Sequence, residues 1–313
     1  MFNKDSKIYV AGHTGLLGSA TVKVLKERGF SNIITKTHSE LELTDKIAVE
    51  NFFKENSIDY VFLCAGKVGG IIGNKTNPAS YLHENLLIQD NIFEMVNKYD
   101  ANNVIFYGSS CTYPKVCEQP MKEDYWLTGA IEETSVGYAA AKIAGIIGCK
   151  SYNNQYNTNK YICVIPNSIY GPFDNFDLEN SHVFSALIRK IDTAKEENKE
   201  LLELWGSGNP RREFIFSEDV ASASIFMMEN ADKLENRHYN LGSGRDFSIK
   251  ELARKISETV GYTGKIEWDT SKPDGTMKKM LDSSRFLELG WEPNVSFEEG
   301  LAITYKWYKE NYE

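Results

Sequence analysis

The first half of the chain alternates short runs of β-branched and aromatic residues with longer segments whose apolar side chains recur at helical spacing. Strands are predicted at residues 7–11, 32–35, 60–64, 103–108 and 161–166, and helices at 20–28, 46–56, 84–99 and 138–156. Short apolar strands that alternate with amphipathic helices are typical of a parallel sheet covered by helices on both faces. The sequence therefore predicts an α/β, doubly wound parallel sheet of the Rossmann type.

After Tyr170-Gly171-Pro172 the pattern changes to loops rich in Asp, Asn and Gly, which indicates a smaller C-terminal α/β domain. Helices are predicted at 183–194, 249–260 and 297–310. A strand at 213–216 and a helix at 220–228 are predicted to return to the main sheet. The predicted main domain comprises residues 1–170 and about 212–241, and the predicted smaller domain comprises about 171–211 and 242–313.

Composition and charge narrow the class of protein. The chain has 42% hydrophobic and 25% charged residues with a net charge of -9, which argues against binding to duplex nucleic acid. No run approaches the roughly 18 to 20 apolar residues of a membrane span, and the first residues lack the apolar core of a signal peptide, so a cytoplasmic location is expected. The five cysteines are odd in number and form no CxxC pair, and nothing indicates a metal site.

A glycine-rich loop follows the first predicted strand and opens a helix. Gly12 would permit a tight turn, Gly15 would let the backbone approach a pyrophosphate, and Gly18 would allow close helix packing. The alternative is a plain strand-to-helix turn, which needs only one or two glycines, but the position near the N-terminus favours a dinucleotide site. The residues predicted to contact the cofactor here are Gly12, His13, Thr14, Gly15, Leu16, Leu17 and Gly18.

The choice of cofactor is read from the end of the second predicted strand. There an acidic residue would bond the ribose of NAD, whereas a cation would accept the additional phosphate of NADP. The sequence is Thr35-Lys36-Thr37-His38, so Lys36 and His38 favour NADP(H). A solvated surface lysine is the alternative reading of Lys36.

A tyrosine and a lysine lie four residues apart on a predicted helix, at Tyr138 and Lys142. An ammonium beside the phenol would lower its pKa from about 10, so that Tyr138 could exchange a proton with a carbonyl oxygen. An ordinary pair on a helix surface is the alternative. Ser109 follows the fourth predicted strand, at the edge of the sheet where ligands of open α/β folds bind, and could bond the same oxygen.

Several longer strings give the chain a resemblance to a known family. They are Lys67-Val68-Gly69-Gly70-Ile71, Gly108-Ser109-Ser110-Cys111, Tyr113-Pro114-Lys115, Lys142-Ile143-Ala144-Gly145, Tyr170-Gly171-Pro172-Phe173-Asp174-Asn175-Phe176, Asn180-Ser181-His182-Val183, Trp205-Gly206-Ser207-Gly208, Arg212-Glu213-Phe214 and Ser271-Lys272-Pro273-Asp274-Gly275-Thr276. In these strings the chain resembles the extended short-chain dehydrogenases/reductases, and within them the GDP-L-fucose synthase family.

The resemblance implies roles for residues at matching positions. Ser109, Tyr138 and Lys142 would form the reductase triad, and Cys111 and His182 would be the base and acid of an epimerisation. Lys142 and His182, with the loop Pro166, Asn167, Ser168 and Ile169, would also contact the cofactor. The positions implied to hold a GDP-sugar are Lys190, Trp205, Arg212 and Asp274. A packed tryptophan and a structural ion pair are alternatives for Trp205 and Arg212, and the other cysteines are expected to be small buried side chains.

The implied activity is an NADPH-dependent 3,5-epimerisation and 4-reduction of GDP-4-keto-6-deoxy-D-mannose by a homodimer that pairs the helices near Glu84 and Tyr138. Many family members have arginine where this chain has Thr14, Lys36 and His38, which would weaken the grip on the 2'-phosphate. A GDP-6-deoxy-heptose or colitose-type substrate, or C4 reduction alone, is an alternative. A non-catalytic NADP-binding regulator is another, since a fold does not fix a function.

Overall fold

The computed structural model describes residues 2–312 and is built around a parallel six-stranded sheet. The strand order is β2-β1-β3-β4-β5-β9, and every neighbouring pair runs parallel. The strands are β1 (Ile8–Ala11), β2 (Ile33–Ile34), β3 (Tyr60–Leu63), β4 (Asn103–Tyr107), β5 (Tyr161–Pro166) and β9 (His238–Leu241). From β1 the chain first adds the edge strand β2 on one side and then β3, β4, β5 and β9 on the other, so the predicted doubly wound fold is confirmed.

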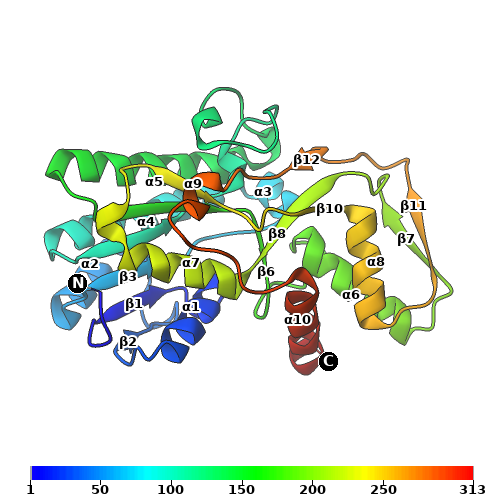
Figure 1. Cartoon of the computed structure of the whole chain (residues 1–313), viewed down its shortest axis with the longest axis horizontal. Helices are drawn as coiled ribbons and strands as arrows, with labels where there is room; N and C mark the ends of the chain where they lie inside the picture. The colour runs from blue at the N-terminus through cyan, green and yellow to red at the C-terminus, as the bar shows by residue number, and fades with distance from the viewer. Residues whose placement is uncertain (1, 313) are drawn as a thin grey trace.

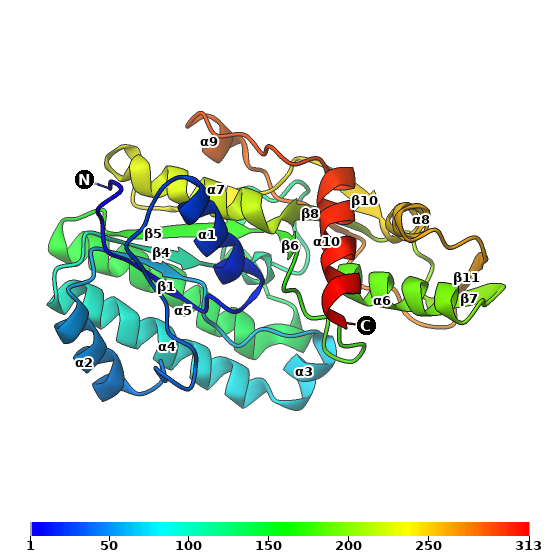
Figure 2. The ribbon, with the colours of Figure 1, turned by 90° about the horizontal axis from the view of Figure 1, so that it is seen from below.

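Helices cover both faces of this sheet (Figure 2). One face carries α2 (Lys46–Asn56), α4 (Pro78–Lys98) and α5 (Val136–Tyr156), and the other carries α1 (Leu16–Glu27), α7 (Ser217–Glu229) and the short α9 (Ser284–Leu287). Side chains of a strand alternate between its two faces. Accordingly Val104 and Phe106 of β4 enter the first core, while Ile105 and Tyr107 enter the second. Both faces are buried, which explains the continuous apolar runs in the sequence.

A smaller lobe follows the main sheet and lies at the right of Figure 1. Its helices are α6 (Val183–Glu196), α8 (Ile249–Val260) and α10 (Phe297–Tyr312), whose apolar faces share one aromatic-rich core. A second sheet is formed by β6 (Ser168–Tyr170), β8 (Arg211–Phe216), β10 (Asp246–Ser248) and β12 (Lys278–Lys279), with β8 at its centre. The parallel pair β7 (Leu201–Trp205) and β11 (Lys265–Asp269) forms the outer edge of the lobe.

One predicted placement is wrong. The strand expected at 213–216 is present as part of β8, but it pairs with β6, β10 and β12 and not with the main sheet. The elements that return to the main sheet are helix α7, which lies on one face, and β9, which pairs with β5. Since β9 occupies the edge beside β5, that edge is closed to β8. The division into a main and a smaller domain at the predicted boundaries stays a prediction.

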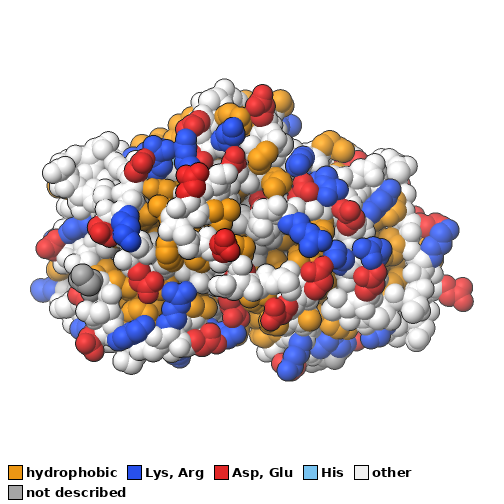
Figure 3. Space-filling model, viewed as in Figure 1, with side chains coloured by type: hydrophobic (Ala, Val, Ile, Leu, Met, Phe, Trp, Pro, Cys, Tyr) orange, Lys and Arg blue, Asp and Glu red, His pale blue; other side chains and the backbone are white. Residues whose placement is uncertain are grey.

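The other predicted elements of the chain are present, and those the patterns missed are short. Helices α3 (Ile71–Thr76) and α9 and the strands β6, β7, β9, β10, β11 and β12 were not predicted. None of the helices within residues 2–312 combines the length and apolar content needed to cross a membrane. On the face shown in Figure 3, lysine and arginine side chains are interspersed with aspartate and glutamate.

Candidate active site

The glycine loop has the backbone that its sequence predicts. Gly12 has φ of +79°, and a Cβ there would come within 2.7 Å of the Ala65 backbone. A Cβ on Gly18 would lie 2.1 Å from the Gly12 carbonyl oxygen, so the start of α1 can approach the loop only with glycine there. Gly15 differs, because its φ is -89° and a Cβ would meet only the Gly12 oxygen at 3.6 Å. Gly15 is exposed at the N-terminus of α1, where backbone N–H groups are free to bind an anion.

The two cations predicted to recognise the 2'-phosphate lie just beyond β2. Lys36 is partly buried, and His38 is exposed and places its Nε2 atom 3.0 Å from Glu42. The carboxylate of Glu40 accepts hydrogen bonds from both the backbone and the hydroxyl of Thr37 at 2.7 Å, which fixes this turn. Lys36 therefore lies next to a turn that is stabilised by the hydrogen bonds between Thr37 and Glu40.

Close packing of α5 on β4 places the proposed reductase residues. A Cβ on Gly145 would lie 2.2 Å from the Phe106 ring, so glycine at this position lets α5 lie directly against the strand. One helical turn earlier, the buried Lys142 donates a hydrogen bond from Nζ to the carbonyl of Tyr107 at 2.9 Å. Ser109 follows the end of β4, and its hydroxyl lies close enough to Tyr138 to lower the pKa of that phenol. The structure thus brings Ser109, Tyr138 and Lys142 together at the carboxyl end of β4.

The expected effect of Lys142 on the phenol is not observed. Burial raises the pKa of Tyr138 well above its usual value, and negative charge on Cys111 adds to the rise, although the hydrogen bond with Ser109 lowers it. Burial also lowers the pKa of Lys142 to about 8. The Lys142 ammonium is turned to the Tyr107 carbonyl, so desolvation outweighs its attraction for a phenolate. In the free protein Tyr138 is therefore a protonated phenol, the form that donates a proton.

Cys111 lies in a short 3₁₀ turn, Ser110–Thr112, directly after Ser109. The Ser109 hydroxyl caps this turn by accepting a hydrogen bond from the Cys111 N–H at 3.2 Å. Burial raises the pKa of the Cys111 thiol. The positive charge of Lys279, together with hydrogen bonds from Ser109, Lys279 and Ser135, outweighs burial and lowers it below its ordinary value. Cys111 is partly exposed as a residue, and the groups around its thiol bias it toward the thiolate.

His182 stands at the start of α6, on the smaller lobe. Its loop is tied to the loop after β3, because the Gly70 N–H donates to the carbonyl of Asn180 at 2.9 Å. Burial raises the pKa of the nearby Asp174, and the hydrogen bond from Ser185 and the charge of His182 oppose this rise only in part. Within residues 2–312 no hydrogen bond or ion pair joins His182 to the other catalytic candidates. Its role as the partner of Cys111 stays a prediction.

The four predicted GDP-sugar contacts line the smaller lobe. Trp205 is 68% exposed at the end of β7, and the Lys190 ammonium lies 5.5 Å from its ring centre. Asp274 accepts hydrogen bonds from the N–H and hydroxyl of Ser207 at 2.8 and 2.6 Å, which brings it beside the same turn. Arg212 donates from one guanidinium nitrogen to the carbonyls of Arg211 and Thr276, each at 2.7 Å. The exposure of Trp205 contradicts the core-tryptophan alternative, and the carbonyl partners of Arg212 contradict a structural ion pair.

The loop that follows β5 is anchored by a buried carboxylate. The N–H of Asn167 donates to Leu241 at 2.9 Å, and its side-chain amide donates to Glu213 at 2.6 Å. The side-chain oxygen of Asn167 is buried and has no partner in the described part of the chain. Pro166 is buried, and Ser168 and Ile169 are partly exposed.

Sequence reasoning missed Lys279, Ser135 and Glu213, which surround Cys111 or support the loop beside it. Lys279 belongs to a strand of two lysines, and two adjacent lysines in the sequence predict an exposed loop. Ser135 precedes α5 without any pattern of its own. Glu213 lies within a string quoted for the family resemblance, and its apolar neighbours Phe214, Ile215 and Phe216 were the available signal that it is buried.

Comparisons with known proteins identify the family of this chain. The model of the NAD dependent epimerase/dehydratase family matches residues 8–242. The chain is 47% identical to the putative GDP-L-fucose synthase 2 of Arabidopsis thaliana over 99% of this chain and 94% of that protein. It is 46% identical to the GDP-L-fucose synthase of Escherichia coli (strain K12) over 97% of each. The solved GDP-mannoheptose C4 reductase MlghC from Campylobacter jejuni, with NADP bound, has a TM-score of 0.91 and 38% identity over 99% of this chain and 100% of that one.

Proposed function

The chain belongs to the NAD dependent epimerase/dehydratase family, and on that premise we propose that it converts GDP-4-keto-6-deoxy-D-mannose to GDP-L-fucose by 3,5-epimerisation and NADPH-dependent 4-reduction. One observation carries this proposal. Ser109, Cys111 and Tyr138 meet at the carboxyl end of β4, in a chain nearly half identical to GDP-L-fucose synthases over almost its whole length. A thiol beside a tyrosine and a serine supplies both a carbon-acid base and a carbonyl proton donor.

The residues around the glycine loop fit NADP(H). Gly15 leaves room at the exposed N-terminus of α1, and the His13 Nδ1 and Asn167 Oδ1 atoms are buried without a protein partner among the described residues. Residues 12–18 would hold the pyrophosphate, Lys36 and His38 the 2'-phosphate, and residues 166–169 the nicotinamide half. The chemistry that the bound cofactor supplies is a hydride for C4 of the sugar.

Epimerisation follows from the acidity that the C4 ketone gives to the C3 and C5 hydrogens. Removal of either proton forms an enolate whose charge lies on the C4 oxygen, where the Tyr138 and Ser109 hydroxyls would stabilise it. Cys111 removes the proton from one face, and His182 returns one to the opposite face. Thiol and imidazole have reference pKa values of about 8.5 and 6.5, so modest shifts suffice for proton transfer near neutral pH.

Reduction uses the same oxygen site. As C4 becomes an alcohol, Tyr138 donates its phenolic proton to the C4 oxygen. The raised pKa of Tyr138 suits this direction, because the phenol is protonated before the reaction begins. Lys142, held by the Tyr107 carbonyl, places a positive charge near the phenolate that remains.

The GDP part of the substrate would lie along the smaller lobe. Trp205 and Lys190 offer an exposed aromatic ring beside a cation, which suits a base and a phosphate. The planar guanidinium of Arg212 suits the diphosphate. Asp274 stands on the turn beside them and can accept hydrogen bonds from sugar or base N–H and O–H groups.

A homodimer and a cytoplasmic location complete the proposal. Helices α4 and α5 lie side by side, and Ile147 and Tyr156 of α5 are 45% and 47% exposed, which is compatible with a contact between two copies. Sedimentation would test the dimer, and a mass of one chain at micromolar concentration would reject it. Fractionation of cells that produce the protein would test the location.

The function is tested by incubating the protein with GDP-4-keto-6-deoxy-D-mannose and NADPH in heavy water. We expect NADPH to be oxidised, which absorbance measures. We expect the GDP-L-fucose product to carry deuterium at C3 and C5, which proton NMR detects. Reduction without exchange would instead identify a C4 reductase. The observation behind that alternative is the 38% identity to the GDP-mannoheptose C4 reductase, and GDP-4-keto-heptoses are the next substrates to assay. A protein inert toward every keto sugar would be a non-catalytic binder.

A further inference from the structure

Two adjacent lysines of β12 point to opposite sides of the second sheet. Strand β12 pairs in parallel with β8, with Lys278 opposite Arg211 and Lys279 opposite Arg212. Successive strand side chains alternate in direction. The Lys278 Nζ lies 3.3 Å from Asp246, on the outer side, whereas the Lys279 Nζ lies 3.5 Å from the Cys111 sulfur. One ammonium therefore faces a carboxylate, and its neighbour faces the thiol of the active site.

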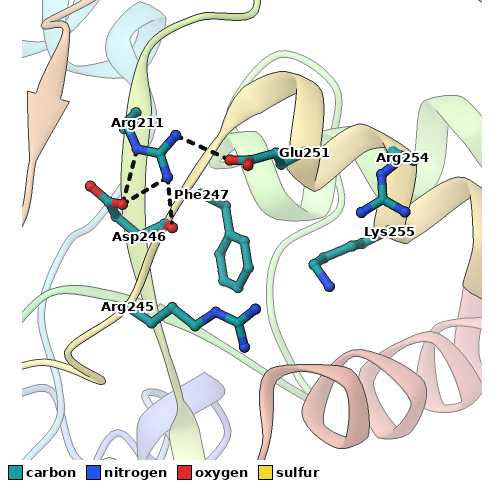
Figure 4. A pocket seen from close by; sticks show the side chains of 7 residues that line it. All are labelled: Arg211, Arg245, Asp246, Phe247, Glu251, Arg254 and Lys255. Carbon is teal, nitrogen blue, oxygen red and sulfur yellow. Dashed lines mark hydrogen bonds and ion pairs between the residues drawn. The ribbon is translucent and has the colours of Figure 1, made fainter.

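The outer side carries a network of ion pairs. It lines part of a hollow of about 270 Å³, where Asp246 pairs with Arg211, and Arg211 also contacts Glu251 (Figure 4). Lys278 joins the same Asp246. On the inner side, no carboxylate of residues 2–312 forms an ion pair with Lys279. The Lys279 ammonium therefore interacts with the Cys111 sulfur and not with a carboxylate.

Hydrogen bonds of the two residues that follow Lys279 fix the backbone that carries it. Beyond it, the buried Glu213 accepts from the Leu281 N–H at 2.9 Å and from the Asn167 side chain at 2.6 Å. Next to it, the Met280 N–H donates to Gln119 at 2.9 Å. Because the Glu213 carboxylate accepts hydrogen bonds from both segments, it fixes the segment after Lys279 relative to the loop after β5. These hydrogen bonds hold β12 in the position that places the Lys279 ammonium beside Cys111.

Four groups besides Lys279 face the Cys111 sulfur. Arg212 of β8 is the second cation, Tyr138 of α5 is the titratable neighbour, and Ser109 and Ser135 are hydroxyl donors. Arg212 directs its hydrogen bonds to the Arg211 and Thr276 carbonyls, whereas Lys279 directs its own to the sulfur. Lys279 is therefore the cation in direct contact with Cys111.

We propose that Lys279 is a positioning residue that holds Cys111 as the thiolate base of the epimerisation. The inference rests on the function proposed above. In the step itself the sulfur lone pair forms an S–H bond with a C3 or C5 hydrogen. The C–H electron pair becomes the enolate double bond, and the carbonyl π pair moves to the C4 oxygen. Lys279 keeps its protons and contributes charge alone, so removing that charge should raise the pH at which Cys111 ionises.

The test is the pH profile of thiol alkylation in the full chain with NADP⁺ added. The protein is treated briefly with iodoacetamide between pH 5.5 and 9.5, and modification of each cysteine is quantified by peptide mass spectrometry. Only the thiolate reacts, so the rate follows ionisation. Cys117, which is partly exposed and whose pKa is raised by burial, is the internal reference. In the unmodified protein Cys111 should titrate at lower pH than Cys117, and the reverse order would overturn the proposal without any variant.

Substitutions separate charge from structure. In Lys279→Met and Lys279→Gln the Cys111 inflection should rise by about one pH unit, which gives about tenfold slower alkylation at pH 7. Lys279→Arg should restore the lower inflection. Lys278→Met removes an equal charge from the same strand on the other side and is the matched control, expected to leave the Cys111 profile unchanged. An unshifted profile in both neutral Lys279 variants, or an equal shift in Lys278→Met, would overturn the proposal.

A substrate assay distinguishes this inference from the function on which it rests. Deuterium exchange at C3 and C5 should shift to higher pH in Lys279→Gln, in parallel with alkylation. If Lys279→Gln raised only KM and left the pH profile of kcat unchanged, Lys279 would be a diphosphate contact and the proposal would fail. Alkylation needs no sugar, so a protein inert toward keto sugars that still showed a Lys279-dependent Cys111 would overturn the proposed function alone.

Discussion

The Nζ atom of Lys142 lies 5.8 Å from the centre of the Tyr138 ring, one helical turn along α5, and donates its hydrogen bond to the carbonyl of Tyr107. The sheet therefore fixes the lysine, and the lysine acts on the phenol through its charge. Because burial keeps Tyr138 protonated, the pair is arranged for proton donation to a substrate oxygen.

Replacing Tyr138 by Phe should remove this donation while keeping the ring that packs beside Lys142. We expect the rate of NADPH oxidation with the keto sugar to fall by about 10²- to 10⁴-fold, the usual contribution of a positioned general acid. Tyr156→Phe, an exposed change at the end of the same helix, is the control and should retain full activity. Near-normal turnover by the Tyr138 variant, with an unchanged melting temperature, would show that another group donates the proton.

Cys111→Ser should separate epimerisation from cofactor binding. The hydroxyl keeps the size of the thiol but is a far weaker acid, so it cannot supply an anionic base near neutral pH. Deuterium exchange at C3 and C5 should slow by at least about 100-fold, while the Kd for NADPH stays within about twofold, as followed by NMR and by fluorescence titration. Cys117→Ser provides the comparison, and exchange by the Cys111 variant at the rate of Cys117→Ser would remove Cys111 from the mechanism.

The sequence predicted those parts of the molecule whose pattern is local. The buried strands of the main sheet are continuous apolar runs, and the spacing of Gly12, Gly15 and Gly18 predicts the turn after β1. Tyr138 and Lys142 could be grouped because four residues make one helical turn. Placing Ser109 beside them needed only the rule that loops at the carboxyl ends of parallel strands meet at one edge.

What the sequence could not show depends on contacts between distant segments. β8 reads like a strand of the main sheet, but its partners are two or three residues long, too short for any periodicity. Lys279 reaches Cys111 across 168 positions of sequence. The sequence also could not predict that the pKa of Tyr138 is raised, because burial of the phenol and the hydrogen bond of Lys142 to Tyr107 are properties of the packed structure.

Two glycines of the same loop should respond differently to alanine. Gly15→Ala places a methyl group in ordinary van der Waals contact with the Gly12 oxygen at 3.6 Å, so the fold should keep its stability. The Kd for NADPH should rise at least about tenfold, since the methyl would obstruct the approach of the pyrophosphate. Gly18→Ala forces a Cβ to 2.1 Å from the Gly12 oxygen and should lower the free energy of unfolding by about 1–3 kcal/mol. Denaturant unfolding and NADPH titration check the pair, and unaltered affinity in Gly15→Ala would place the pyrophosphate elsewhere.

His238 should make the fold sensitive to acid. The ring is buried in β9, its Nε2 lies 3.4 Å from the Tyr113 hydroxyl, and its Nδ1 has no partner in the described part of the chain. Burial, together with the positive charges of Lys150, Arg237 and Arg285, lowers the pKa of His238 to about 3. The native ring is therefore neutral, whereas the unfolded ring accepts a proton below about pH 6.5.

The sign of the effect follows from proton binding. Below about pH 6.5 the unfolded state holds a proton at His238 that the folded state lacks, so the stability that this ring contributes at neutral pH is lost as the pH falls toward 3. His238→Phe removes the titration and keeps an aromatic ring beside Tyr113, which retains its 2.7 Å hydrogen bond to Asn240. Relative to this variant, the wild type should lose about 1.4 kcal/mol of unfolding free energy per pH unit well below 6.5. Urea unfolding between pH 7.5 and 4.5 measures the difference. His83→Gln, an exposed change on α4, should keep the wild-type slope, and parallel curves for wild type and His238→Phe would mean that His238 is protonated in the folded protein.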